Sequence, residues 1–187
     1  MKKHREKENH INIILKALQY SEIDLIWQQI NRRELITQNY VKQHTLQLVD
    51  CFYDVQHWDA YHLENDPPKL KQLYHEHAAF IGAFNPQGKL VGICVVSNQR
   101  IQDYPEARLL HYFYVDADQQ GQGIGAQLMQ AAKNAAIELG GNELYISATP
   151  SKRTVDFYLK HGAEVLDNPD QQLWQLEPDD IHLLCKI

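Results

Sequence analysis

One segment limits the possible folds more than any other. An apolar run, Leu109–Val115, leads through a short polar stretch at 116–119 into the sequence QGQGIGA at 120–126. An apolar-periodic segment follows at once and continues to about Leu139, where two glycines end it. This order predicts a strand, a glycine-rich turn and a helix, so several backbone N–H groups meet the positive end of a helix. Such a point binds anions, and glycines let a phosphate group approach the backbone.

Two well-known phosphate motifs fit this segment poorly. A Walker loop needs Lys-Ser or Lys-Thr after its last glycine, but Ala126 and Gln127 stand there. The dinucleotide pattern G-x-G-x-x-G/A is formally present at Gly121, Gly123 and Ala126. Its strand, however, should run almost directly into the first glycine, and its ribose-binding acid should close the next predicted strand. Here polar residues intervene, and Glu143 opens that strand.

The motif Gln120-x-x-Gly123-x-Gly125 resembles the R/Q-x-x-G-x-G/A motif of the GNAT superfamily of acyl-CoA-dependent N-acyltransferases. The resemblance implies acetyl-CoA as co-substrate, held at its pyrophosphate by the main chain of Gln120, Gly121, Gln122, Gly123, Ile124, Gly125 and Ala126. It also implies a sheet that splays after the strand Leu109–Val115, with the pantetheine in the gap. Main-chain groups of Phe113, Tyr114 and Val115 would pair with the pantetheine and polarise the thioester carbonyl.

A second block resembles the family pattern N-x-x-A-x-x-F-Y-x-x-x-G-F. Phe157, Tyr158 and Gly162 match it, whereas Ser151 replaces the common Asn and keeps a hydroxyl that could contact the cofactor. The resemblance implies that Tyr158 protonates the departing thiolate, because a phenol is protonated at neutral pH. The alternative is that Tyr158 only packs on the cofactor.

The amine must reach the thioester uncharged, which requires a base. His111 is the first candidate, because simple alternation places it on the same strand face as Phe113 and Val115. Glu76, with its neighbours His75 and His77, is the second. This cluster lacks the spacing of a zinc motif, so no metal site is expected. A water chain could also replace a side-chain base.

Composition indicates one domain at 11–187 after a flexible, charged tail at 1–10. The chain has 187 residues and a formal net charge of −6, which argues against nucleic acid or an anionic membrane as partner. No signal peptide or membrane span is recognisable in the sequence. Three widely spaced cysteines indicate a reduced, cytoplasmic protein.

The expected fold is α/β: a single GNAT-like domain with a central mixed sheet flanked by helices. Hairpin strands are predicted on either side of the Asn85-Pro86-Gln87-Gly88 turn. Residues 35–77 read as a polar and aromatic stretch with helical patches, broken at Pro67 and Pro68. The segments Leu173–Leu176 and Ile181–Ile187 are predicted as final strand material.

Acceptor choice in the family comes mainly from the region after the first strand and from the C-terminal hairpin. That region contains aromatic residues beside acids, which would suit a cationic amine or would simply be core and solvated surface: Phe52, Tyr53, Trp58, Tyr61 and Tyr74, with Asp50, Asp54, Asp59 and Glu64. Asp179, Asp180 and His182 would border the same site.

Three functions remain open from the sequence. The first is an N-acetyltransferase for a small-molecule amine, and the second is one for a protein or peptide. The third is a non-catalytic acyl-CoA-binding module. A homodimer is possible in each case, since dimers are common in the family.

Overall fold

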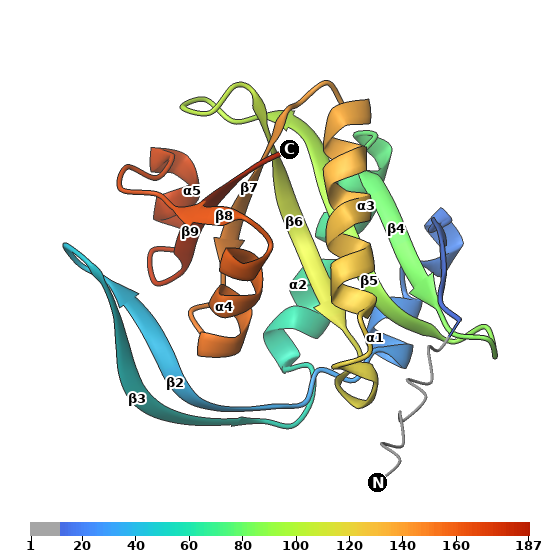
Figure 1. Cartoon of the computed structure of the whole chain (residues 1–187). Coiled ribbons are helices and arrows are strands. Elements are labelled where there is room, and N and C mark those ends of the chain that lie inside the picture. Colours follow the sequence, from blue (N-terminus) through green and yellow to red (C-terminus); the bar gives the residue numbers. More distant parts are fainter. Residues whose placement is uncertain (1–11) are drawn as a thin grey trace, which may run out of the picture.

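A seven-stranded mixed sheet forms the centre of the computed structural model, which describes residues 12–187; the tail expected at 1–10 lies outside this range. The strands are arranged in the order β1-β4-β5-β6-β7-β9-β8 (Figure 1). Their bounds are Ile14–Ala17 (β1), Ala79–Phe84 (β4), Leu90–Arg100 (β5), Ala107–Val115 (β6), Glu143–Ala148 (β7), Ala163–Val165 (β8) and Ile181–Lys186 (β9). The mixed sheet confirms the expected α/β fold.

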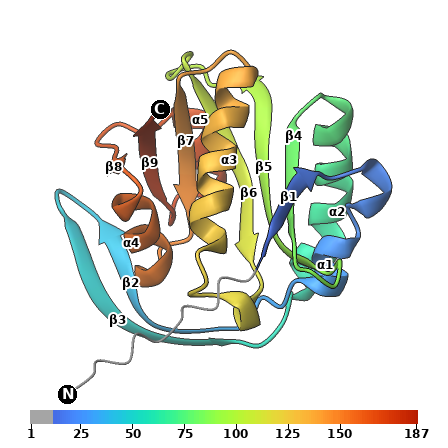
Figure 2. The same cartoon turned by 45° about the vertical axis from the view of Figure 1, so that its right-hand side comes forward.

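Helices cover both faces of this sheet (Figure 2). Helix α3 (Ile124–Glu138) and helix α4 (Lys152–Lys160) share one core, in which Leu128 and Val155 are fully buried. Helix α1 (Leu25–Gln29) and helix α2 (Ala60–His75) cover the other face, where Ile26 and Leu70 are buried. The sheet therefore has an α3 side and an α2 side, and its central strands contribute side chains to both.

At one point of their pairing, strand β6 has one extra residue relative to its partner β5. Val95 lies opposite Tyr112, and the next residue of β5, Val96, lies opposite Leu110. His111 is therefore the extra residue of a β-bulge, which shifts the alternation of side chains by one position. Leu110 belongs to the core on the α3 side, whereas Tyr112 belongs to the core on the α2 side.

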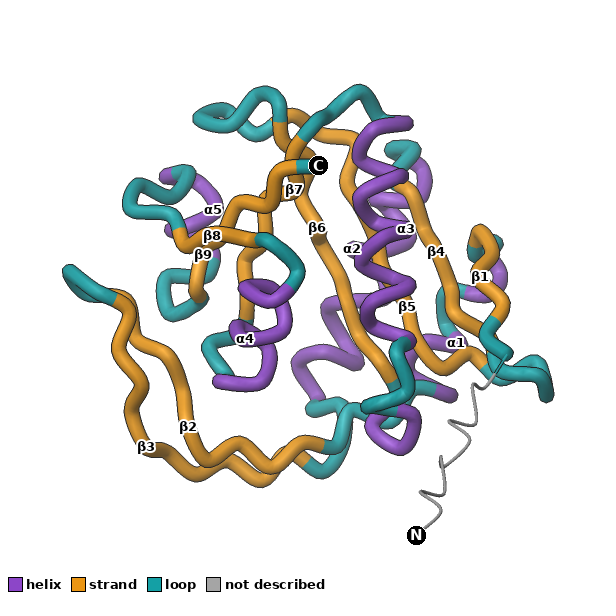
Figure 3. Tube along the Cα trace, viewed as in Figure 1, coloured by secondary structure: helices purple, strands orange, loops and turns teal. Residues whose placement is uncertain are grey.

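Strands β6 and β7 separate at the middle of the sheet. Their parallel pairing reaches only Leu110 and Ile146. Strand β6 nevertheless continues to Val115, and strand β7 continues to Ala148. The splay expected beside the Leu109–Val115 strand is therefore present, and the separation leaves one edge of β6 without a strand partner (Figure 3).

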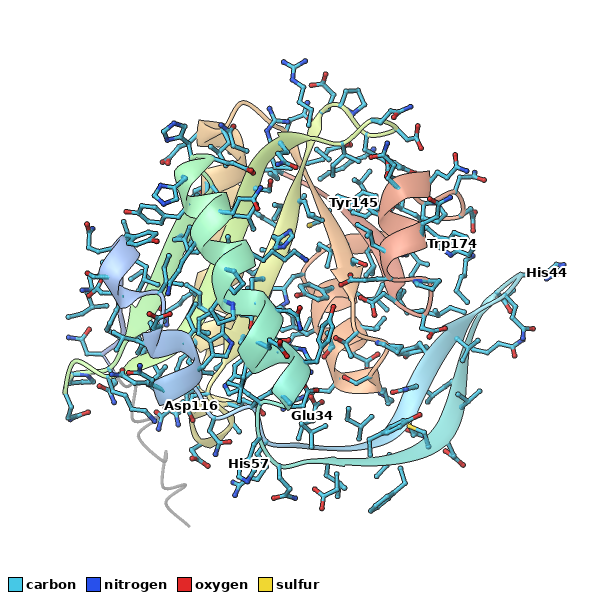
Figure 4. All side chains as sticks on the ribbon, turned by 180° about the vertical axis from the view of Figure 1, so that it is seen from behind. Glu34, His44, His57, Asp116, Tyr145 and Trp174 are labelled. Atoms are coloured by element: carbon cyan, nitrogen blue, oxygen red, sulfur yellow. The ribbon has the colours of Figure 1, made fainter. Side chains whose placement is uncertain are left out.

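A two-stranded arm replaces the helical patches predicted for the first part of 35–77. Strands β2 (Glu34–Lys42) and β3 (Leu46–Val55) form a hairpin that curves away from the body, with Glu34 at its base and His44 at its tip (Figures 1 and 4). The even-numbered residues of β2 are half-buried and most odd-numbered ones are exposed, as in a strand with one covered face. The backbone N–H of Tyr40 donates to the carbonyl of Pro150 at 2.8 Å, which attaches the arm near α4.

Two further sequence predictions are wrong in detail. Pro67 and Pro68 lie inside α2 instead of ending it. Asp59 caps the start of that helix, and the buried Leu70 and Leu73 hold its second half on the sheet, which offsets the lost hydrogen bonds. The segment at 173–176 is part of a short helix, α5 (Gln171–Leu176), rather than a strand.

No helix within residues 12–187 is both long and apolar enough to cross a membrane.

Candidate active site

A buried carboxylate, that of Asp116, holds the first part of the loop between β6 and α3 in place. The Asp116 side chain has no exposed surface; it accepts a hydrogen bond from the backbone N–H of Asp118 at 2.9 Å and pairs with Lys89 at 2.8 Å. The Asp116 N–H donates to the carbonyl of Val91. These contacts hold the start of the glycine loop against β5.

The glycines of the loop serve two different purposes. Gly121 and Gly123 have φ values of 77° and 80°, and a Cβ on either would meet no atom within 4 Å. Gly123 is also the N-cap of α3, so the free N–H groups of that helix begin in open space. Gly125 is different, because a Cβ there would lie 3.1 Å from the ring of Phe157. The loop thus offers an open backbone surface, and Gly125 lets α4 pack closely beside it.

The N-terminus of α4 lies on the other side of the gap. The Ser151 hydroxyl caps this helix and lies 3.3 Å from Glu34 Oε1 and 2.9 Å from the Thr154 hydroxyl, so it is already hydrogen-bonded within the protein. Arg153 donates to Gln120 Oε1 and to Glu34 Oε2, the latter at 3.1 Å. One guanidinium therefore links the glycine loop, α4 and the base of the arm.

Tyr158, on α4, packs against the part of β6 that has no partner on β7. Its side chain is 6% exposed and packs edge-on against Phe113, with the ring centroids 6.0 Å apart. Burial raises the pKa of Tyr158, and Tyr114, Cys94 and Asp180 add to this rise. Within residues 12–187 its hydroxyl has no hydrogen-bonding partner, so it can donate to another molecule.

His111 lies on the α2 side of the sheet, so the expectation that it shares a face with Phe113 and Val115 is wrong. The bulge is the cause: it groups His111 with Tyr112 and returns Phe113 to the α3 side. Burial, together with the charge of Lys69 on α2, lowers the pKa of His111 to about 4. The imidazole is therefore neutral at pH 7 but only weakly basic.

On the α2 side, aromatic rings surround the end of β6. Trp58 packs against Tyr114 with ring centroids 4.7 Å apart, and the Arg32 guanidinium lies 5.4 Å from the Trp58 centroid and 5.7 Å from that of Tyr114. The Tyr112 hydroxyl donates to Asp66 Oδ2 at 2.9 Å. The chain's own cation, Arg32, thus occupies part of this aromatic site.

Charged groups of both signs act on Tyr114. Burial is the main cause that raises the pKa of Tyr114 to about 12; Arg32 opposes this rise, and Asp66, Asp180 and Glu177 add to it. Three carboxyl groups and one guanidinium therefore act on this hydroxyl.

The polar clusters noted in the sequence lie elsewhere. Phe52, Tyr53 and Tyr61 are exposed, so of the predicted pocket aromatics Trp58 is the one that reaches Tyr114. Glu76 accepts hydrogen bonds from Gln72 at 2.8 Å and from Gln99 at 2.7 Å, near the end of β5 that pairs with the beginning of β6. No group of three or more His, Cys, Asp or Glu side chains in the described range is arranged to hold a metal ion.

The family model described as an acetyltransferase (GNAT) domain matches residues 37–174. The chain belongs to the GNAT family. It is therefore an acetyltransferase, and its acetyl donor is acetyl-CoA.

Solved structures show the same fold at low sequence identity. A nourseothricin acetyltransferase superposes with a TM-score of 0.68 at 16% identity, covering 93% of this chain and 98% of the other. A Bacillus anthracis protein assigned as a streptothricin acetyltransferase, in complex with acetyl coenzyme A, gives 0.65 at 16% identity, with coverages of 95% and 99%. The PaiA N-acetyltransferase of Thermoplasma acidophilum, in complex with coenzyme A, gives 0.62 at 14% identity, with coverages of 95% and 100%. None of the curated proteins matches the sequence significantly.

For a GNAT enzyme, two observations on this chain fit acetyl-CoA. The backbone next to Gly121 and Gly123 is open, and the edge of β6 from Phe113 to Val115 has no strand partner. The sequence motifs identified both features. They did not identify Arg32, Asp66 or Tyr112, because these residues converge only through packing of α1 and α2 on the sheet.

Proposed function

We propose that this GNAT enzyme transfers the acetyl group of acetyl-CoA to a primary amine of a small, cationic molecule by direct attack. The observation that carries the proposal is the aromatic site at Tyr114, at the end of β6, with carboxyl groups around it. Trp58 packs on Tyr114, Asp66 accepts a hydrogen bond from Tyr112, and Asp66, Asp180 and Glu177 all raise the pKa of Tyr114 against the lowering by Arg32. A protonated amine gains from both features, through ionic attraction and cation–π contact.

The cofactor residues of this proposal are those of the two sequence motifs. The main chain of 120–126 would bind the pyrophosphate at the N-terminus of α3, and the free edge at 113–115 would bind the pantetheine. The amides at this edge would also polarise the thioester carbonyl. Ser151 contributes less than expected, because its hydroxyl already caps α4. Arg153 contacts Gln120 of the loop and is a cation next to the proposed phosphate site, where its pairing with Glu34 would compete with a phosphate.

Tyr158 is proposed to assist the departure of the thiolate. Acetyl-CoA supplies an activated acetyl group and a sulfur leaving group. The raised pKa of Tyr158 keeps its hydroxyl protonated throughout the physiological range, so the hydroxyl can always donate a hydrogen bond to sulfur. Geometry supports this role, because the hydroxyl has no other partner within residues 12–187.

A cavity of about 650 Å³ lies next to this aromatic site, between α1 and the start of α2. Arg32 and Trp58, which lie against Tyr114, are among its lining residues. A cavity of this volume fits a small-molecule acceptor. Two similar structures are, moreover, of enzymes named for nourseothricin and streptothricin.

A panel of amines tests this function through release of free thiol from acetyl-CoA. Butylamine and 1,4-diaminobutane form a matched pair that differs by one positive charge, and lysine, spermidine, kanamycin and a lysine-containing peptide complete the set. We expect kcat/KM at low salt to be at least about tenfold higher for the diamine than for butylamine, and this ratio to shrink as salt screens the charges. Acetylation of the peptide alone would favour a protein acetyltransferase, and no turnover with any acceptor would favour a binding module.

A further inference from the structure

Asp180 lies at the gap between β6 and β7, at the start of β9. Ile181, the next residue, pairs with Ala148 at the end of β7, and His182 pairs with Ser147. Both β7 residues lie beyond Ile146, where the pairing with β6 has already ended. The topology therefore places Asp180 at the open side of the splay.

The carboxyl of Asp180 is hydrogen-bonded to the end of β7 and acts on groups already assigned to the reaction. The Ser147 hydroxyl donates to Asp180 Oδ2 at 3.3 Å. The charge of Asp180 also raises the pKa of Tyr114 on β6 and that of Tyr158 on α4. This carboxyl therefore acts electrostatically on the hydroxyl proposed to assist thiolate departure.

The carboxyl of Asp180 is half-buried, and the ionisable groups that act on it are acids. They are Glu177 and Asp179 in the preceding loop; Ser147, on β7, is neutral. No cation within residues 12–187 contributes to its titration. Burial, followed by repulsion from Glu177, raises the pKa of Asp180 to about 7. A carboxylate without a cationic partner at this position suits a protonated amine.

We propose that Asp180 is the catalytic base, which removes the proton from the ammonium group of the acceptor. This inference rests on the proposed function, since it requires a cationic amine. The N–H bond of the ammonium breaks, and the proton moves to Asp180 Oδ. The freed lone pair forms the new C–N bond as the C–S bond breaks, and Tyr158 gives its proton to the departing sulfur. The nitrogen of the new amide then loses its second proton, which returns through solvent to Tyr158 and restores the phenol. The proton then leaves Asp180 to solvent, which restores the carboxylate.

His111 is the weaker alternative for this step. Its pKa of about 4 lies about three units below that of Asp180, which corresponds to about a thousandfold lower basicity. A base works best when its pKa lies near the working pH, and Asp180 meets this condition. Burial next to Lys69 makes His111 a poor acceptor of a second positive charge.

The test compares Asp180→Asn with Glu164→Gln, which removes an exposed carboxyl on the neighbouring strand β8 and serves as control, using the amine panel as acceptors. We expect Asp180→Asn to lower kcat about 10²- to 10⁴-fold and to abolish the rise of kcat/KM with pH near 7. Affinity for acetyl-CoA, measured by calorimetry, should stay within about twofold in both variants, which also shows that they fold. Glu164→Gln should retain wild-type kcat.

A third variant, Glu177→Gln, examines the same base without removing it. Loss of the repelling charge should move the rise in kcat/KM to lower pH while turnover persists. If the wild type acetylates an amine and Asp180→Asn keeps both its rate and its pH profile, the base assignment is wrong but the proposed function stands. If the wild type acetylates none of the amines, both proposals fail.

Discussion

Replacing Gly123 with alanine separates the backbone role of the glycine loop from its role in binding. Gly123 has φ 80°, and a Cβ there meets no atom within 4 Å. The folded protein should therefore lose only the cost of a left-handed alanine, about 1–2 kcal/mol, which lowers Tm by about 2–8 °C in a chain of this size. The added methyl would occupy the space proposed for the pyrophosphate, so affinity for coenzyme A should fall at least about tenfold.

Gly88 provides a matched control for this substitution. It has φ 77°, and a Cβ there also meets no atom within 4 Å, but it lies in the turn between β4 and β5 rather than in the loop. Gly88→Ala should cost the same stability in thermal denaturation and leave the calorimetric affinity for coenzyme A unchanged. Equal affinities in the two variants would refute the assignment of the loop to the pyrophosphate.

Two further substitutions test the groups at the gap. Tyr158→Phe removes a hydroxyl that has no hydrogen-bonding partner in residues 12–187, so the free energy of unfolding should change by less than about 0.5 kcal/mol. Steady-state kcat should fall about 10²-fold or more, and an unchanged kcat would exclude its role in leaving-group departure. Asp180→Asn should stabilise the protein in urea denaturation at pH 8 by about 1–2 kcal/mol and leave it unchanged at pH 3. The native carboxyl, with its pKa raised to about 7, holds a proton that the unfolded chain releases at about pH 4, so the wild type loses stability as pH rises between these values. The full shift of about three units would give about 4 kcal/mol, which partial exposure of Asp180 reduces. An equal difference at both pH values would contradict the raised pKa.

The sequence was sufficient for the parts of the fold that depend on local signals. The strand before Asp116, the turn at 120–126 and the helix after it follow from hydrophobic period and glycine placement. The resemblance to two family motifs located the splay and Tyr158. Each of these features is encoded within about 50 consecutive residues.

The arm at 34–55 was missed because its turn carries no hairpin signal. Residues 43–45 contain neither glycine nor proline, and β2 becomes one-sided only through its contact with α4. The helix break predicted at Pro67 and Pro68 was wrong for a related reason. The packing of Leu70 and Leu73 on the sheet keeps the chain helical in spite of the two prolines.

The site was only partly predictable because it depends on a one-residue irregularity. Alternation along β6 places His111 with Phe113, and the bulge reverses this relation. No sequence pattern in this strand predicts the bulge. Asp180 reaches the gap through the pairing of β9 with β7, a contact between segments more than 30 residues apart in the chain.

Calorimetric titration of the purified protein with acetyl-CoA, with NADH as the control, tests the central claim most directly. Saturable binding of acetyl-CoA without binding of NADH is the predicted result, because the open loop suits the pyrophosphate of the cofactor and the free edge of β6 suits its pantetheine. Binding of NADH, or no binding of acetyl-CoA by a folded sample, would contradict the account.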